Sequence, residues 1–322
     1  MTTIAIIGLG GHAVKNTLPA LNDAPNLNLV GCFTRNQERR LEIAQQYQIK
    51  YWETEDEVYT AQDVDAIYLA TPTGVHYEQV KQALEHGKHV FCEKSFVTTA
   101  NEAKELCALA ERKGLFLAEC FMYLYHSQFR RVHELCTEGA LGQIHQVTAR
   151  FGYPHLPPDN IRYNAALGGG ALLDAAVYPL SALYALSDGN CSHLDGHAFT
   201  EDGYEVDTHG AASFIGENQM IGHAQWGMGR DYSNDIVIWG SQGQMLVERA
   251  FSKPPSLETR VQISRNGKVE TITIEPDNHF IQMFEAFASS IGNDEKHQLH
   301  RKQIVDMATL LEQIRSNRAI RQ

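Results

Sequence analysis

The first third of the chain alternates between short apolar runs and longer segments that mix apolar and polar positions. The short runs are typical of parallel strands that are buried on both faces, and the segments between them have helical spacing. This alternation calls for a parallel sheet with helices on both faces that binds its ligand at the carboxyl ends of the strands. The pattern predicts strands at residues 3–7, 27–34, 63–70, 88–92 and 115–118, and helices at residues 37–47, 75–86 and 100–113.

The pattern changes after about residue 121. A loop rich in Pro and Asn follows the first elements of this half. The later strands alternate only in part, which indicates a large mixed sheet with helices over one face and another face that needs cover. We expect helices at residues 127–138, from 171, at 279–291 and at 302–317, and strands at 144–151, 194–200, 206–215, 219–228, 234–239, 244–248, 259–264 and 269–274.

The first strand runs directly into a glycine-rich turn. Its residues are Gly8, Leu9, Gly10, Gly11, His12 and Ala13. In a dinucleotide-binding turn of this type, Gly8 allows the tight bend, Gly10 lets backbone amides approach a pyrophosphate, and Ala13 lets the helix pack on the strand. The pyrophosphate then lies at the N-terminus of the following helix. The pattern alone also fits a turn that binds nothing, but the strand before it and the alternation after it favour a nucleotide site.

These two patterns together predict an α/β protein with two domains. We expect an N-terminal Rossmann dinucleotide-binding domain at residues 1–120. A C-terminal α+β domain with a large open mixed sheet, at residues 121–322, would bind the substrate and other copies of the chain.

Composition and charge narrow the classes of function. The chain has 322 residues, 43% of them hydrophobic and 20% charged, which is enough for two globular domains. A net charge of −12 argues against nucleic-acid binding by bulk electrostatics. The six cysteines and 15 histidines form no metal-binding pattern, so we expect no metal site and a reduced, cytoplasmic protein without a signal peptide.

Residues 165–186 form a long, nearly uncharged stretch that resembles a membrane span. It contains three consecutive glycines, carries Asp174 near its middle and Pro179 beyond, and lacks basic flanks. A central Asp alone costs roughly 2.5–3.5 kcal/mol on insertion scales. We interpret the stretch as a buried helix that carries a functional carboxylate, and we expect no membrane partner.

The end of the second strand bears on the choice between NAD and NADP. A carboxylate at this position binds the ribose hydroxyls of NAD, but here the first acid is Glu38. Arg35 is expected to pair with a 2′-phosphate and stack on adenine, with Thr34 donating to the phosphate and Arg39 and Arg40 adding positive charge. NADP is therefore favoured and NAD stays possible. The alternative is that these are ordinary surface arginines.

Two further loops leave strand carboxyl ends. Thr71 and Pro72 are expected to border the ribose and nicotinamide, while His76 either hydrogen-bonds nearby or caps the next helix. Glu93 and Lys94 follow the next strand, and we count them with the cofactor-binding residues. Lys94 is expected to point into the ligand crevice, the alternative being a salt bridge with Glu93.

Four motifs in order resemble those of one known family. They are GLGGHA at residues 8–13, DVDAIYLATPTGVH at 63–76, HGKHVFCEKS at 86–95 and LGGGALLDAAVYP at 167–179. The family is that of glucose–fructose oxidoreductase, inositol dehydrogenase and the rhizopine-catabolism proteins. The resemblance implies a dinucleotide-binding domain, a second domain with a large open sheet, and oxidation or reduction of sugars and polyols. Within the family, the chain is most similar to pyranose and dihydrodiol dehydrogenases and to deoxysugar 3-ketoreductases.

The chain departs from the family pattern at two positions. Ser95 stands where the family usually has proline, which leaves open what makes the loop of Lys94 rigid. Leu124 stands where relatives often have an arginine, and the loss of this contact to an anionic substrate indicates a different substrate.

Asp174 and Tyr178 stand four positions apart, so that they share one face if the helix is continuous. Pro179 is expected to kink this helix and tip Tyr178 outwards. Ketone reduction needs a proton donor as hydride arrives, and tyrosine is a competent acid. The ammonium group of Lys94 would stabilise both tyrosinate and charge on the substrate oxygen. The resemblance assigns catalysis to the same three positions, although Tyr178 is alternatively a buried aromatic capped by Asp174.

Three other residues, His126, Tyr153 and Arg162, are expected to line the substrate pocket, although Arg162 alternatively bridges two elements. The sequence thus predicts an NADP-dependent oxidoreductase acting on a carbonyl or secondary alcohol of a sugar-like substrate, with Tyr178 as acid and base assisted by Lys94. Its partners would be that small molecule and further copies in a homodimer or homotetramer, with no nucleic acid. The alternatives are a ketoreductase of nucleotide-linked deoxysugars, an enzyme that returns the hydride in each cycle, and a non-catalytic NADP-binding sensor.

Overall fold

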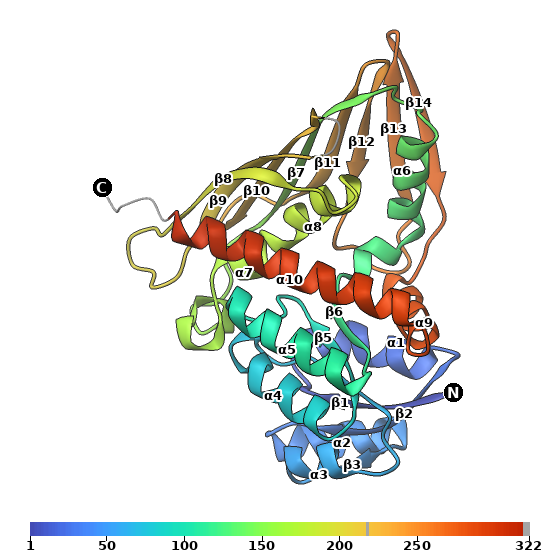
Figure 1. Cartoon of the computed structure of the whole chain (residues 1–322), viewed down its shortest axis with the longest axis vertical. Helices are drawn as coiled ribbons and strands as arrows, with labels where there is room; N and C mark the ends of the chain where they lie inside the picture. Colours follow the sequence, from blue (N-terminus) through green and yellow to red (C-terminus); the bar gives the residue numbers. More distant parts are fainter. Residues whose placement is uncertain (217–218, 318–322) are drawn as a thin grey trace. The chain divides into compact units, whose positions relative to one another are not determined.

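The computed structural model describes residues 1–216 and 219–317, which form two compact units (Figure 1). The first unit combines Met1–Met122 with Phe280–Ala308, and the second combines Tyr123–His279 with the residues from Thr309 on. The sequence places a boundary near residue 120 but does not assign the segment Phe280–Ala308 to the N-terminal unit. Residues 217–218 and 318–322, which belong to the expected second domain, lie outside the described residues.

The first unit contains a six-stranded parallel sheet with the strand order β3-β2-β1-β4-β5-β6. The order reverses between β1 and β4, which is the switch point where doubly wound sheets bind nucleotides. The predicted α/β fold class is therefore confirmed. The strands are β1 (Thr2–Ile7), β2 (Leu27–Phe33), β3 (Lys50–Tyr51), β4 (Ala66–Leu69), β5 (His89–Glu93) and β6 (Leu117–Cys120).

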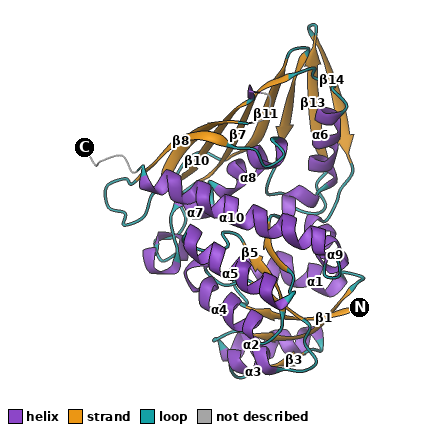
Figure 2. Ribbon diagram, in the orientation of Figure 1, coloured by secondary structure: helices purple, strands orange, loops and turns teal. Residues whose placement is uncertain are grey.

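Helices connect these strands and pack against the sheet (Figure 2). Thr54 and Thr99 each cap a helix in a reciprocal capping box, and Gly114 ends one of them in the left-handed conformation. The helix α3 and the short strand β3 were not expected, because two exposed strand residues and a six-residue helix give little periodic signal. The helices are η1 (Ala13–Thr17, a π-helix), α1 (Leu18–Asp23), α2 (Gln37–Tyr47), α3 (Glu55–Thr60), α4 (Thr73–Glu85) and α5 (Ala100–Lys113).

Aromatic packing explains why a late segment belongs to the first unit. The helices α9 (His279–Ser290) and α10 (Asp294–Ser316) are the last elements of the described chain, and α9 carries three buried phenylalanines, two of which contact the strands. The ring of Phe284 lies 5.3 Å from that of Tyr68 on β4, and the ring of Phe287 lies 5.3 Å from that of Phe91 on β5. Buried aromatic pairs of this kind add to the stabilisation that comes from burial itself.

The second unit contains an eight-stranded mixed sheet with the order β14-β13-β12-β11-β7-β10-β9-β8. Its only parallel pair among the described residues is β7 with β10. The predicted large open sheet is therefore confirmed. The strands are β7 (Ile144–Tyr153), β8 (Ser192–Phe199), β9 (His209–Ile215), β10 (Ile221–Met228), β11 (Ser233–Gly240), β12 (Gly243–Glu248), β13 (Thr259–Arg265) and β14 (Lys268–Ile274).

Helices of the second unit lie against one face of this sheet (Figure 1). The helix α8 packs on β7 and β10, and α6 packs on β13. The helical segments are α6 (Ser127–Thr137), α7 (Ala171–Asp174), α8 (Val177–Leu186), and the 3-10 turns η2 (Met122–Tyr125), η3 (Ile161–Tyr163) and η4 (Ala165–Leu167).

The segment 165–186 is broken rather than one continuous helix. Asp174 ends α7, whereas Tyr178 is the second residue of α8, so the expectation that they share a face of one helix is wrong. The N–H groups of both Ala175 and Ala176 donate to the carbonyl of Ala171, and the helix ladder shifts at that point. Pro179 is the third residue of α8, where a missing N–H breaks no helical bond, so the bend comes before Tyr178 and not at the proline.

In the described part of the chain, no single helix combines the length and apolarity needed to cross a membrane. The segments Ala165–Asp174 and Val177–Leu186 meet those criteria only as a pair, and a bend of 48° separates them. Most of their side chains are buried within the protein, as the sequence predicted.

Candidate functional site

The glycine turn leaves β1 between the ends of its two neighbouring strands. The N–H of Gly8 donates to the carbonyl of Phe33 at the end of β2, over 2.9 Å. Gly8 has φ +98°, and a Cβ there would lie 2.7 Å from the carbonyl carbon and oxygen of Ala70, so only glycine fits. At Gly10 and Gly11, by contrast, a Cβ would meet no described heavy atom within 4 Å. The turn therefore has the shape that a pyrophosphate needs: a tight bend followed by open backbone before a helix.

The loop after β2 is tied to this turn. Asn36 caps α2 by accepting from the N–H of Arg39, and the guanidinium of Arg39 donates to the carbonyl of Leu9 over 3.2 Å. Arg35 is exposed and forms no ion pair with any described residue. Arg35 thus stands in the loop after β2, and Arg39 stands in the first turn of α2. Their contact with a 2′-phosphate stays a prediction.

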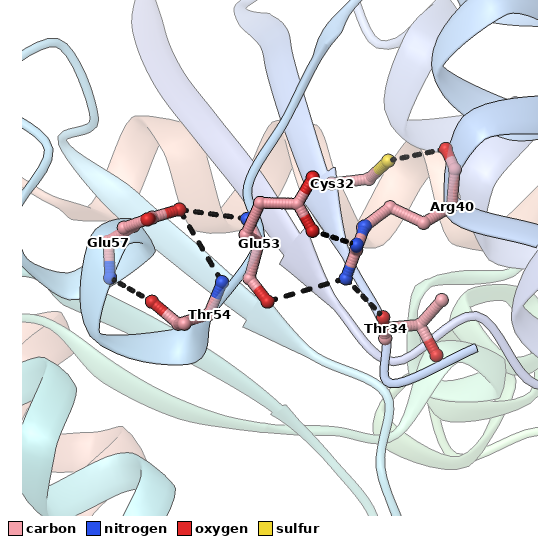
Figure 3. A network of polar contacts seen from close by, with 6 residues as sticks. All are labelled: Cys32, Thr34, Arg40, Glu53, Thr54 and Glu57. Atoms are coloured by element: carbon pink, nitrogen blue, oxygen red, sulfur yellow. Dashed lines mark hydrogen bonds and ion pairs between the residues drawn. The ribbon is translucent and has the colours of Figure 1, made fainter. Parts of the chain in front are cut away.

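Arg40 has a structural role instead of the predicted contribution to phosphate binding. Its buried guanidinium forms an ion pair with Glu53 and donates to the carbonyls of Thr34 and Glu53 over 3.2 and 3.4 Å (Figure 3). It also lies over the ring of Phe33, 5.8 Å from the centroid. The buried side chain of Arg40 therefore joins the backbone of Thr34 to that of Glu53.

His76 lies completely buried behind the loops that follow β4 and β5. Its Nε2 is 2.8 Å from the carbonyl oxygen of Thr71, and its Nδ1 is 3.0 Å from those of both Ser95 and Phe96. Burial lowers the pKa of His76, and the three carbonyl acceptors oppose that shift. The ring thus joins the two loops through their backbones rather than facing a ligand.

The loop that carries Lys94 is held at both ends. The carboxylate of Glu93 accepts a hydrogen bond from the buried hydroxyl of Tyr68 on β4. Beyond Lys94, the N–H of Phe96 donates over 2.9 Å to Oε1 of Glu119, a buried residue of β6. Burial raises the pKa of Glu119 to about 8, and the neighbouring charge of Lys94 opposes the shift. Glu119 is therefore mostly protonated at neutral pH.

In the second unit, three predicted residues meet at one carboxylate. Oδ2 of Asp174 accepts from the hydroxyl of Tyr153 at the end of β7, and from Nε of Arg162 on η3 over 2.7 Å. Asp174 raises the pKa of Arg162, and burial and Asp174 together raise the pKa of Tyr153. The ion pair joins η3 to α7, which agrees with the alternative interpretation of Arg162 as a bridge between two elements.

A residue that the sequence did not reveal positions α7. The side chain of Asp207 accepts from the N–H of Leu172 over 2.6 Å, and its backbone carbonyl accepts from the N–H of Ala171 over 2.8 Å. A Cβ on Gly170 would lie 2.4 Å from Oδ1 of Asp207, and one on Gly169 would lie 2.5 Å from the carbonyl oxygen of Arg162. The glycine run therefore lets two loops approach the start of α7. No local motif links Asp207 to this run.

Tyr178 and His126 occupy different surroundings. The ring of Tyr178 is 93% shielded and packs 4.8 Å from the ring of Phe151 and 5.7 Å from that of Phe251, centroid to centroid. His126 was expected in the substrate pocket, but it is fully buried and its Nδ1 accepts from the N–H of Gln128 at the start of α6. Burial lowers its pKa to about 4. The structure thus gives His126 a helix-capping role.

The predicted catalytic residues come from both units. Lys94 belongs to the unit that contains the glycine turn, and Asp174 and Tyr178 belong to the unit that contains the eight-stranded sheet. Thr71 and Pro72 also belong to the first unit and immediately precede α4, with Pro72 at its N-cap.

Two family models match most of the chain. Residues 2–121 match an oxidoreductase family with an NAD-binding Rossmann fold, and residues 129–246 match the GFO/IDH/MocA C-terminal domain.

Relatives of known activity include sugar reductases and dehydrogenases. A dTDP-3,4-didehydro-2,6-dideoxy-alpha-D-glucose 3-reductase from Saccharopolyspora spinosa is 32% identical, over 89% of this chain and 87% of the relative. A D-xylose 1-dehydrogenase (NADP(+)) from Haloferax volcanii is 27% identical, over 96% of this chain and 95% of the relative.

The fold is also similar to that of solved structures. A 3-ketoreductase from Actinomadura kijaniata, in complex with NADP and TDP-benzene, has a TM-score of 0.91 and 29% identity, with 98% of each chain covered. Variants of that enzyme with a tyrosine replaced by phenylalanine, or a lysine by alanine, give TM-scores of 0.92 and 0.90.

The raised pKa of Glu119 predicts a pH-dependent penalty on stability. Because the folded protein holds this proton up to about pH 8 and the unfolded chain releases it near 4.5, Glu119 makes the folded state less stable as pH rises between these values. The variant Glu119→Gln keeps the shape without the charge, so its free energy of unfolding relative to the parent should rise by up to about 1.4 kcal/mol per pH unit. Urea unfolding from pH 5 to 8.5 measures this difference. The variant Glu105→Gln, at an exposed position, is the control. If the free energy of unfolding changes with pH in the same way in Glu119→Gln and in the parent, the raised pKa of Glu119 is contradicted.

Proposed function

The chain belongs to the GFO/IDH/MocA family of oxidoreductases, and from this premise we propose that it transfers hydride between NADP(H) and a carbonyl or secondary alcohol of a sugar-like substrate. The observation that carries the proposal is the arrangement at one edge of the six-stranded sheet. There the glycine turn after β1, the arginine loop after β2 and the Lys94 loop after β5 all leave carboxyl ends of parallel strands. Such an edge is where doubly wound sheets bind their ligands.

The cofactor is NADP(H). The open backbone at Gly10 and Gly11 accommodates the pyrophosphate, and Arg35 and Arg39 hold the 2′-phosphate. The loop of Thr71 and Pro72 borders the ribose and the nicotinamide. When bound, the nicotinamide supplies or accepts the hydride.

We assign the proton transfer to Tyr178. In the direction of reduction, its hydroxyl donates a proton to the substrate oxygen as hydride reaches the carbon. The ammonium group of Lys94 stabilises the negative charge that develops on that oxygen and on the phenolate.

Asp174 keeps two donors in fixed positions for the substrate. Its Oδ2 restrains the hydroxyl of Tyr153 and the guanidinium of Arg162, and the side chain of Arg162 is one-third exposed. We propose that this set orients the hydroxyl groups of the sugar. Partly buried charge-assisted bonds suit this role because they hold their geometry before the substrate arrives.

The solved variants of the Actinomadura 3-ketoreductase support the choice of Lys94 and Tyr178. The lysine and the tyrosine replaced in that enzyme are separated by the same number of positions as Lys94 and Tyr178. Its complex contains TDP-benzene, and the Saccharopolyspora relative acts on a dTDP-linked 3-keto sugar. These similarities favour a nucleotide-linked 3-keto deoxysugar as the substrate. The xylose dehydrogenase among the relatives favours an unlinked sugar as the second candidate.

Replacing either catalytic residue should abolish most of the turnover. We expect Tyr178→Phe to lower kcat by about 100- to 10,000-fold, because a general acid is lost. Lys94→Met should lower kcat by roughly 100- to 1,000-fold, because charge stabilisation is lost. Oxidation of NADPH in the presence of a dTDP-linked 3-keto sugar, followed by absorbance, measures both.

Tyr123→Phe is the matched control for this experiment. Tyr123 lies in the same aromatic cluster, 6.1 Å from Tyr178 between centroids, and its hydroxyl bonds to Ser181 over 2.7 Å. The control should keep its turnover, and both tyrosine variants should keep their NADPH affinity. Wild-type turnover in Tyr178→Phe and Lys94→Met would refute the catalytic assignment.

The arginine loop predicts a preference for NADPH that depends on one side chain. Arg35→Ala should raise the Kd for NADPH by about 10- to 100-fold, because a charge-assisted bond to phosphate is lost, and should leave the Kd for NADH almost unchanged. Fluorescence titration of both cofactors measures this. Arg112→Ala, which removes an exposed arginine at the end of α5, is the control. An equal rise in the Kd for NADPH and for NADH would show that Arg35 does not bind the 2′-phosphate.

We also propose that a second copy of the chain covers the free face of the eight-stranded sheet. Trp239 on β11, Ile221 on β10 and Ile215 on β9 lie in one cross-strand register, in which Gln146 on β7 stands between Trp239 and Ile221, and the three apolar residues are 58%, 46% and 41% exposed. Large exposed apolar side chains grouped in this way on an open sheet are typical of an interface. Sedimentation should show an oligomer that Trp239→Glu converts to monomers, while Leu299→Glu, an exposed position on α10, has no effect. A monomeric parent protein at micromolar concentration would refute this proposal.

A further inference from the structure

We propose that His76 and Glu119 are positioning residues that together fix the backbone of the loop presenting Lys94. This inference rests on the proposed function, in which Lys94 is catalytic. Neither side chain needs to touch the substrate to act in this way.

The backbone polar groups that directly follow Lys94 are bonded to side chains of other elements. Ser95 and Phe96 are buried, so each of their backbone groups needs a partner within the protein. The N–H of Phe96 finds Oε1 of Glu119 at 2.9 Å, and the carbonyls of Ser95 and Phe96 both lie 3.0 Å from Nδ1 of His76. Two consecutive peptide groups, Ser95–Phe96 and Phe96–Val97, are thus restrained by two side chains.

The side chains of Glu119 and His76 both belong to regular elements of the first unit. Glu119 belongs to β6, the strand next to β5, and is paired in register with Cys92. His76 belongs to the first turn of α4, and its Nε2 contacts the carbonyl of Thr71 at 2.8 Å. Strand and helix backbones move less than loops, so bonds to β6 and α4 restrain the position of the Lys94 loop. The ring of His76 therefore lies against backbone carbonyls of both the Lys94 loop and the Thr71 loop.

Ser95 directly follows Lys94 and stands where the family usually has proline. Proline restricts the backbone through its ring. Serine imposes no such restriction, so this chain must hold the loop by other means. The contacts of His76 and Glu119 supply the restraint on both sides of the peptide group between Ser95 and Phe96. A catalytic group that is displaced by about 1 Å loses on the order of 100-fold in rate, so the restraint has a measurable consequence.

A pair of substitutions at Glu119 tests the inference. Glu119→Gln keeps an oxygen that accepts from the N–H of Phe96, whereas Glu119→Leu removes the acceptor. We expect Glu119→Leu to speed hydrogen–deuterium exchange of segment 93–98 at least tenfold and to lower kcat about 100-fold, with little change in the Kd for NADPH. Glu119→Gln should restore both exchange protection and kcat to within a few-fold of the parent. This rescue would not follow if Glu119 acted through its charge.

His76 provides a second, independent pair. His76→Leu removes the donor to Ser95 and Phe96, and His76→Gln keeps a donor of similar reach. We expect the same two effects in His76→Leu and about a tenfold loss of kcat in His76→Gln. If His76→Leu does not fold, His76→Ala carries the test, because it also removes the donor: unchanged exchange and kcat in His76→Ala would then overturn the role of His76. If Glu119→Leu does not fold, Glu119→Gln carries the test: slow exchange together with a 100-fold lower kcat in Glu119→Gln would overturn the role of Glu119.

Lys88→Met is the matched control. Lys88 precedes β5 at the opposite end of the strand, and its buried Nζ donates to the carbonyls of Ala61 and Val64 over 2.6 and 2.8 Å. Its loss should lower stability without changing exchange at segment 93–98 or kcat. If Lys94→Met loses turnover while the His76 and Glu119 leucine variants keep both protection and turnover, the inference is overturned and the proposed function stands. If those variants release the loop but Lys94→Met keeps its turnover, the proposed function fails instead.

Discussion

Parallel hydrogen bonding between β1 and its two neighbours, and between β4 and β5, determines where the chemistry of the first unit can occur. Because these strands run in the same direction, their four carboxyl ends lie at one edge. The loops that begin there carry the glycine turn, the arginines, Thr71 and Lys94. The strands are almost entirely buried, so their register is fixed by packing on both faces as well as by the ladder itself. Each loop therefore starts from a position that the core defines.

Backbone groups in the loops at this edge are bonded to charged or polar side chains of other elements. Arg40 holds the backbone at Thr34, and His76 and Glu119 hold the backbone after Lys94. A buried polar group without a partner costs about 1–3 kcal/mol, so each of these contacts also stabilises the fold. Precision at the loops and stability of the unit thus depend on the same bonds.

The second unit follows the same principle with different elements. Asp207 supports the start of α7 from a distant loop, and the glycines before α7 allow that loop to come close. Asp174, at the end of α7, then restrains Tyr153 and Arg162. Because α7 is a single turn, its position depends on these long-range contacts more than on its own helical bonds. The ion pair at Asp174 is therefore a property of the whole unit.

The sequence by itself determined the strands and most helices, because a buried strand or an amphipathic helix leaves a periodic record in neighbouring residues. It also determined the glycine turn and the fold class, since a positive φ beside a neighbouring strand admits only glycine. Tertiary structure alone decided that Arg40 is buried, that His126 caps a helix, that the chain bends before Tyr178 and that Asp207, inside a predicted strand, caps α7 instead. These outcomes depend on which carbonyl or N–H group comes within hydrogen-bond distance in the folded chain, and the periodicity of neighbouring residues does not reveal such contacts.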